Sequence, residues 1–174
     1  MSGASKGNGG EGNGASGVLT ADRKQTATGR KPTVSHVLGE IVWLYSQSPT
    51  HKHFTIGDLE WMVMPAILLE QFRIFHGEKA PVGVAVWAWL SEEAERRLKD
   101  AVAAGRGARL KPDEWKSGDR LWVLDLVAPL ATPDNKLVEA MLADLAQNVF
   151  PGRTIRLHAT DPATGKREMK EIGG

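Results

Sequence analysis

The chain has 174 residues, 41% of them hydrophobic, which is enough for one soluble domain with a packed core. Its 22 basic and 21 acidic residues almost cancel and form no dense basic run, so the charge pattern does not indicate a nucleic-acid or membrane surface. Cysteine is absent, which excludes disulfides, thiolate catalysis and cysteine-ligated zinc, and no apolar run of about 18 residues is present to span a bilayer. The first residues do not resemble a secretory signal peptide, and we expect a cytoplasmic protein.

Residues 1–31 are rich in Gly, Ser, Thr and Asn and contain almost no large apolar side chains. Such a segment cannot bury enough surface to offset the entropy cost of ordering it. The sequence therefore predicts a disordered tail over 1–31 and one folded domain over 32–174.

The first helical pattern of the domain stops shortly before a proline. Apolar residues recur at helical spacing, which predicts an amphipathic helix over 34–46, and Pro49 follows it. The chain then reaches His51, so the helix end delivers a histidine into a turn. Imidazole has an unperturbed pKa of about 6.5 and can accept and return protons near neutral pH, which makes this turn a candidate for catalysis.

Capping patterns predict two further helices. Asp58 is expected to cap a short helix that ends at Met64, because Pro65 follows. Ser91 is expected to cap a solvated helix that has acids at its start and bases further on. Gly105 can end this helix in the left-handed conformation.

Strand patterns complete the domain. The runs 67–75 and 82–90 predict one hairpin, and the late runs predict a second hairpin around the turn at 161–165. A helix capped at Thr132, with a proline in its first turn, is expected to run to about Val149. The expected strands are 67–75, 82–90, 121–129, 154–159 and 166–172. Because both faces of the strand over 82–90 are apolar, it should lie inside the sheet. The element order predicts an α+β domain with a mainly antiparallel sheet flanked by helices.

One carboxylate interrupts the apolar strand over 121–129. Asp125 lies between two leucines, where an unpaired charge would be costly, so it needs a partner. One interpretation is structural, either an ion pair with an arginine such as Arg120 or Arg73 or a hydrogen bond into a turn. The other is catalytic: Asp125 accepts a hydrogen bond from one nitrogen of His51, so that the other nitrogen can act as a base.

The chain has five histidines that could compete for this role. We expect His36, His76 and His158 to be surface or packing residues. His53 forms a His-x-His pair with His51, but no cysteine or acidic cluster accompanies it, so it is only a weak signal for a metal site.

Other catalytic patterns are weak or absent. The glycine segment 105–108 follows a solvated helix rather than a strand, which favours a helix stop over a phosphate-binding loop. No Gly-x-Ser-x-Gly motif occurs, so a serine hydrolase is not expected. The six tryptophans lie in apolar runs and are expected in the core.

Short motifs are spread over about residues 34 to 160. They are Val37-Leu38-Gly39, Trp43-Leu44, Ser48-Pro49-Thr50-His51, Met64-Pro65-Ala66-Ile67, Trp87-Ala88, Leu90-Ser91, Trp115-Lys116-Ser117-Gly118-Asp119-Arg120, Trp122 and Asp125-Leu126-Val127-Ala128-Pro129. In this order and spacing they resemble the RTX toxin-activating lysine acyltransferases, the haemolysin-activator C proteins.

The resemblance implies an acetyltransferase-like (GNAT-like) α+β fold and a cytoplasmic enzyme that tends to be a homodimer. It implies transfer of a fatty acyl chain from acyl carrier protein to internal lysines of an RTX-type protoxin, with no tightly bound cofactor and no metal. By position in the motifs it implies His51 and Asp125 as catalytic residues, with Ser48 in a supporting role. Met62 stands where relatives of the haemolysin activator carry asparagine, so that amide is missing here.

The chemistry of this reaction needs a base. A lysine amine with a pKa near 10.4 must lose a proton to attack a thioester, which costs on the order of 4 to 5 kcal/mol at pH 7. His51 can serve as that base, or it can attack the thioester itself to form an acyl-histidine. An apolar channel, for which Met62, Met64 and Leu68 are candidate lining residues, would hold the acyl chain. Two other functions stay open: an enzyme that uses acyl-coenzyme A on a small amine, and a non-catalytic chaperone of an RTX-type partner.

Overall fold

The computed structural model describes residues 31–107, 109–160 and 167–173, so the tail expected over 1–31 lies outside the described residues except for Lys31. Among the described residues the helices are α1 (Val34–Gln47), α2 (Ile56–Met62), α3 (Met64–Leu68), α4 (Glu92–Ala103) and α5 (Leu137–Asp144), with a 3₁₀ helix η1 (Pro112–Trp115) and a π-helical turn η2 (Leu145–Val149). The strands are β1 (Phe72–His76), β2 (Pro81–Leu90), β3 (Arg120–Val127), β4 (Ile155–Thr160) and β5 (Arg167–Ile172). No helix in these ranges is long and apolar enough to cross a membrane.

The strands form one sheet in the order β1-β2-β3-β4-β5. Three neighbouring pairs are antiparallel, and β3 with β4 is parallel over only Trp122–Arg156 and Val123–Leu157. As expected from its two apolar faces, β2 is an interior strand that pairs on both sides. The predicted α+β class with a mainly antiparallel sheet is confirmed.

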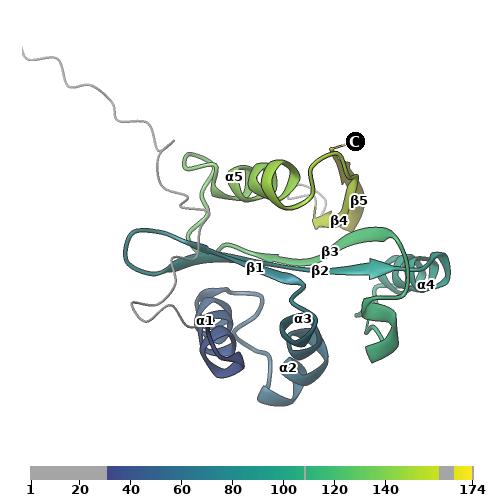
Figure 1. Cartoon of the computed structure of the whole chain (residues 1–174), viewed down its shortest axis with the longest axis horizontal. Coiled ribbons are helices and arrows are strands. Elements are labelled where there is room, and N and C mark those ends of the chain that lie inside the picture. The colour runs from purple at the N-terminus through teal and green to yellow at the C-terminus, as the bar shows by residue number, and fades with distance from the viewer. Residues whose placement is uncertain (1–30, 108, 161–166, 174) are drawn as a thin grey trace, which may run out of the picture.

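Helices cover both faces of the sheet. Figure 1 shows α1, α2 and α3 on one face and α5 on the other. The buried apolar residues accordingly form two clusters, one beneath α1, α3 and α4 and the other beneath α5. Side chains of β2 alternate between them: Val84 and Val86 belong to the first cluster, and Ala85 and Trp87 to the second. This alternation follows from the pleat of a strand, which points successive side chains to opposite faces.

The segment after α1 differs from the prediction. Asp58 is not the N-cap residue of α2 but the third residue of its first turn, where it forms a capping box with Thr55. Its Oδ2 accepts from the Thr55 N–H and the Thr55 hydroxyl, both at 2.8 Å. The backbone hydrogen bond from Thr55, followed by the one from its hydroxyl, lowers the pKa of the Asp58 carboxyl. Pro65 does not end a helix either, but lies in the first turn of α3, where a missing amide hydrogen costs little.

The strand expected over 67–75 is shorter than predicted. Residues up to Leu68 belong to α3, Glu70 turns the chain with a φ of 56°, and β1 begins only at Phe72. Ile67 is buried as a helical residue. A short apolar run cannot by itself distinguish a strand from a buried helical turn, which explains the error.

The helix expected from Thr132 begins later. The Thr132 hydroxyl accepts from the Asn135 N–H at 3.2 Å, and the Asn135 side chain accepts from the Thr132 N–H at 3.0 Å, but these bonds close only a turn. Lys136 then has a φ of 47°, in the left-handed region, so α5 starts at Leu137. The last residues, up to Val149, form η2 rather than an α-helix.

The other predicted elements are confirmed. The range of α1 matches, the Ser91 hydroxyl accepts from the Ala94 N–H at 3.2 Å to cap α4, and Gly105 follows α4 with a φ of 67°. The late strands β4 and β5 pair as a hairpin, whose predicted turn at 161–165 lies outside the described residues. The tryptophans are not all in the core, because Trp43 is 43% exposed.

Candidate active site

The end of α1 holds Ser48 and His51 in defined positions. The Ser48 N–H donates to the Tyr45 carbonyl at 3.0 Å, and the Ser48 carbonyl accepts from the N–H groups of His51 at 3.1 Å and Lys52 at 3.0 Å. The His51 carbonyl in turn accepts from the Phe54 N–H at 2.9 Å. Ser48 is buried. These successive turns set the direction in which the imidazole leaves the backbone.

A β-bulge turns Asp125 toward α1. Asp125 pairs with Val86 and Val123 pairs with Trp87, so Leu124 is an extra residue in β3. In a regular strand Asp125 would share the face of Val123, which packs in the cluster beneath α5. The bulge reverses this alternation and directs the carboxylate to the face that α1 covers.

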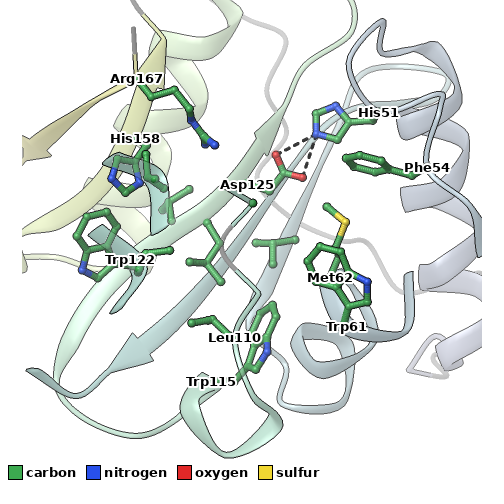
Figure 2. Close-up of a pocket in the computed structure, with 16 residues that line it drawn as sticks. His51, Phe54, Trp61, Met62, Leu110, Trp115, Trp122, Asp125, His158 and Arg167 are labelled. Atoms are coloured by element: carbon green, nitrogen blue, oxygen red, sulfur yellow. Dashed lines mark hydrogen bonds and ion pairs between the residues drawn. The ribbon is translucent and has the colours of Figure 1, made fainter. Parts of the chain in front are cut away.

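The structure brings His51 and Asp125 into contact. His51 Nε2 lies 3.2 Å from both carboxylate oxygens of Asp125, as Figure 2 shows. The two side chains are only 15% and 22% exposed. Because an ionised carboxylate can only accept hydrogen bonds, this contact favours a proton on Nε2 while no substrate is bound.

The other nitrogen of His51 faces hydroxyl groups. Nδ1 lies 2.7 Å from Ser48 Oγ and 2.8 Å from Thr50 Oγ1, and these two oxygens are 3.1 Å apart. A hydroxyl can either donate to Nδ1 or accept from it, so both tautomers of the ring can be satisfied on this side. Ser48 and Thr50 thus both contact the same nitrogen of His51.

Tyr45 is a further member of this cluster, and no motif pointed to it. Its hydroxyl donates to Asp125 Oδ2 at 2.6 Å, and its ring centroid lies 4.7 Å from that of His51. Burial raises the pKa of the Tyr45 phenol well above its ordinary value, and the charge of Asp125 and its hydrogen bond raise it further. A signal was present in the sequence, because Tyr45 belongs to the buried stripe of α1 and a buried tyrosine hydroxyl usually needs a partner.

The arginines considered as alternative partners of Asp125 lie in other ion pairs. Arg120 contacts Glu95 at 2.9 Å and Glu92 at 3.0 Å, and Arg73 contacts Asp144 at 2.6 Å. The side-chain contacts that Asp125 makes among the described residues are instead with His51 and Tyr45.

The other four histidines have different surroundings. His36 and His53 are exposed, and His76 Nε2 lies 2.9 Å from a carboxylate oxygen of Glu40. His158 is half-buried on β4 and lines a cavity. Within the described ranges no group of three or more His, Cys, Asp or Glu side chains is arranged to hold a metal ion.

An apolar cavity of about 310 Å³ lies beside the His51–Asp125 pair. Its apolar wall residues come from distant parts of the chain: Phe54, Trp61, Met62, Val86, Leu98, Val102, Leu110, Trp115, Trp122, Val123 and Leu124. Of the three candidate lining residues, Met62 lines this cavity, and Met64 and Leu68 are not among its lining residues. The nitrogen on the cavity side of the imidazole is Nε2 (Figure 2), which also contacts Asp125, and Nδ1 is covered by protein hydroxyls. The expected arrangement, in which the nitrogen that does not contact Asp125 faces the substrate, is therefore not the one found.

The end of the cavity opposite His51 carries basic groups. Figure 2 shows His158 and Arg167 beside Trp122 at this end. The Nζ atom of Lys99 lies 5.8 Å from the centre of the Trp122 ring. Partial burial is the main cause that lowers the pKa of His158, and the positive charges of Arg167 and Lys99 lower it further.

Comparison with known proteins shows similarity of this chain to lysine acyltransferases. The model of the RTX toxin acyltransferase family matches residues 30–171. The RTX-II toxin-activating lysine-acyltransferase ApxIIC of Actinobacillus pleuropneumoniae is 33% identical over 135 residues, which cover 75% of this chain and 77% of that protein. The protein-lysine myristoyltransferase HlyC of Escherichia coli is 30% identical over 138 residues, which cover 79% of this chain and 75% of that protein.

A solved structure supports the fold. The loading GNATL domain of CurA from Lyngbya majuscula superimposes with a TM-score of 0.50 and 11% sequence identity, over 78% of this chain and 65% of that chain. At this low identity the likeness concerns the fold alone, and it confirms the acetyltransferase-like architecture.

Proposed function

The chain belongs to the RTX toxin acyltransferase family, and on that premise we propose that it moves a fatty acyl chain from acyl carrier protein to internal lysines of an RTX-type protoxin. His51 is the proposed base and Asp125 its partner, with Ser48 in support. The observation that carries the proposal is the contact of His51 Nε2 with Asp125 at the side of an apolar cavity. A buried acid–imidazole pair supplies proton transfer, and an apolar cavity supplies room for an acyl chain.

The proposed reaction begins with the lysine ammonium between Asp125 and His51 Nε2. An ammonium group at this point can donate to both the Asp125 carboxylate and His51 Nε2. Nε2 then accepts a hydrogen bond instead of donating one, so it does not carry the ring proton. The ring proton then resides on Nδ1, where the hydroxyls of Ser48 and Thr50 can accept it. The lone pair of Nε2 is thereby directed at the substrate nitrogen.

Acyl transfer then forms one bond and breaks one. A first ammonium proton passes to solvent, and the amine attacks the thioester carbonyl carbon to form the C–N bond. As the C–S bond breaks, the second proton passes from the substrate nitrogen to Nε2 and on to the departing thiolate of the carrier. The products are an amide and a thiol, and His51 is again a neutral imidazole with its proton on Nδ1. Proton exchange with solvent restores the Nε2–H form after the product has left.

An acyl-histidine route uses the same geometry. Nε2 would attack the thioester first, and lysine would then take the acyl group from the imidazole. Rapid quenching of the enzyme with acyl carrier protein donor, in the absence of protoxin, distinguishes the routes. A mass increase on the peptide that contains His51 supports the two-step route, and an unmodified peptide supports direct transfer.

The wider setting belongs to the same proposal. We place the enzyme in the cytoplasm as a homodimer whose catalytic domain spans 32–174. The donor class is tested by turnover with acyl carrier protein thioesters against acyl-coenzyme A. Turnover with acyl-coenzyme A on a small amine alone would support the alternative enzyme, and protoxin binding without any mass change would support a chaperone.

The main test is co-expression with an RTX protoxin, followed by mass spectrometry of its lysines. His51→Ala should abolish acylation because the base is lost, and Asp125→Asn should reduce it strongly. His53→Ala is the matched control, since His53 is an exposed histidine close by in the same loop. Full acylation by the His51→Ala enzyme would refute the proposal.

A further inference from the structure

Tyr45 contacts both members of the proposed catalytic pair. Its hydroxyl donates to Asp125 Oδ2 at 2.6 Å, and its ring lies against His51 at an interplanar angle of 41°. It also meets Phe54, a cavity residue, edge to face at a centroid distance of 6.3 Å. The side chain is 4% exposed, so these neighbours hold the ring in place.

The Tyr45 hydroxyl is a permanent donor. Its raised pKa keeps the phenol protonated throughout the pH range in which an imidazole changes its charge. A phenol has one proton to donate, and the short distance to Oδ2 shows where this proton goes. Among the described residues, the titratable groups that contact Asp125 are Tyr45 and His51.

The Asp125 carboxylate needs such a donor to keep one orientation. His51 Nε2 is 3.2 Å from each oxygen, so the imidazole alone does not select one of them. The carboxylate is 22% exposed, and water competes for it. The bulge at Leu124 directs the side chain to the correct face, but it does not set the rotation of the carboxylate.

We propose that Tyr45 is a positioning residue, which fixes the Asp125 carboxylate so that it can orient His51 and receive the substrate cation. This inference rests on the proposed acyl transfer. Tyr45 acts through Asp125 and does not touch the reacting atoms.

Tyr45→Phe tests the inference, because it keeps the ring and removes only the hydroxyl. We expect kcat for protoxin acylation to fall on the order of ten- to hundred-fold, as for loss of a hydrogen bond to a charged group, with an unchanged KM for the acyl donor. Ile41→Val is the control, since it removes a buried methyl group from the same helix and leaves the hydroxyl in place. The control should keep the wild-type kcat.

A second measurement does not depend on activity. The chain contains one tyrosine, so phenolate absorbance in an alkaline titration reports Tyr45 alone. The phenol of the Asp125→Asn protein should ionise at lower pH than that of the wild type, because the negative charge and the charged acceptor are gone. The Asp119→Asn protein, with an exposed aspartate changed, should titrate like the wild type.

The outcomes separate this inference from the function. If the wild-type enzyme acylates the protoxin and Tyr45→Phe has the same kcat, the positioning role is wrong and the function stands. Equal phenol titrations in the wild-type and Asp125→Asn proteins would also overturn it. A wild-type enzyme that does not acylate refutes the proposed function itself, whereas the phenol titration still reports the Tyr45–Asp125 contact.

Discussion

Ser48 Oγ lies 2.7 Å from His51 Nδ1, on the opposite side of the imidazole from Asp125. The order hydroxyl, imidazole, carboxylate resembles a hydrolase triad, but Ser48 is buried and is absent from the cavity wall. We therefore propose that its hydroxyl supports the ring rather than acting as a nucleophile. Thr50 Oγ1 lies 2.8 Å from the same nitrogen and is a second candidate support.

The first prediction follows from the presence of two hydroxyls at His51 Nδ1. Ser48→Ala and Thr50→Val should each retain most of the acylation rate, because the remaining hydroxyl still meets Nδ1. In the double variant the acylation rate should fall on the order of ten-fold, since neither hydroxyl then meets Nδ1. This fall should exceed the product of the two single effects. Initial acylation rates of the three variants test this. Complete inactivity of Ser48→Ala alone would contradict it and indicate a nucleophilic serine.

The second prediction concerns the acyl chain. Val102 lines the cavity of about 310 Å³, and Val102→Phe places a larger side chain in that space. We expect the preference among octanoyl, lauroyl and palmitoyl carrier-protein donors to shift toward the shorter chains, because less volume remains. Competition between the three donors, read by mass spectrometry of the product, measures the shift. Val34→Phe is the control on an exposed part of α1, and an equal shift in that variant would disprove a steric effect in the cavity.

The third prediction concerns a buried carboxylate behind the cavity wall. Glu95 is 5% exposed and accepts from Trp122 Nε1 and from Arg120, both at 2.9 Å. Glu95→Ala leaves the buried Trp122 N–H without its acceptor and leaves Arg120 with Glu92 alone, so the free energy of unfolding should fall by about 1–3 kcal/mol. Glu93→Ala, at an exposed position of the same helix, should change it by less than about 0.5 kcal/mol. Urea denaturation of both variants provides the comparison, and equal midpoints would contradict the prediction.

The fourth prediction concerns acid pH. The pKa of His158 is lowered from 6.5 in the folded protein, chiefly by burial and then by Arg167 and Lys99. At pH values between 6.5 and the lower pKa of the folded protein, the unfolded chain binds more protons at His158 than the folded chain does. The free energy of unfolding must therefore fall as the pH falls through this window. His158→Phe keeps a ring against Trp122 and removes the titration. The difference in unfolding free energy, wild type minus variant, should decrease from pH 7 toward acid. A constant difference would show that His158 titrates equally in both states.

The sequence alone determined the features that depend on local spacing. Helical periodicity predicted α1, and the proline after it predicted that His51 would lie in a turn at the helix end. Alternation and flanking turns predicted the β1–β2 hairpin and the interior position of β2. Asp125 was recognised because a charge in an apolar strand needs a partner. These features can be predicted from sequence because helix and strand patterns repeat within a few residues.

Local sequence patterns gave wrong helix boundaries where they are compatible with two conformations. Pro65 can end one helix or begin the next, and its position in α3 depends on how that turn packs its apolar residues against β2. Thr132 makes capping bonds, yet the left-handed Lys136 delays the helix. In both cases tertiary packing selects between conformations of similar local energy.

Only the tertiary structure decided how the site is assembled. The extra residue Leu124 turns Asp125 to the face of α1, and this reversal has no trace in the apolar run of β3. The Tyr45 hydroxyl reaches Asp125 across 80 positions of the chain, and His51 reaches it across 74. Contacts between such distant residues depend on strand register and on the placement of α1 over the sheet. No local periodicity encodes that placement, because it is set by which buried surfaces fit together.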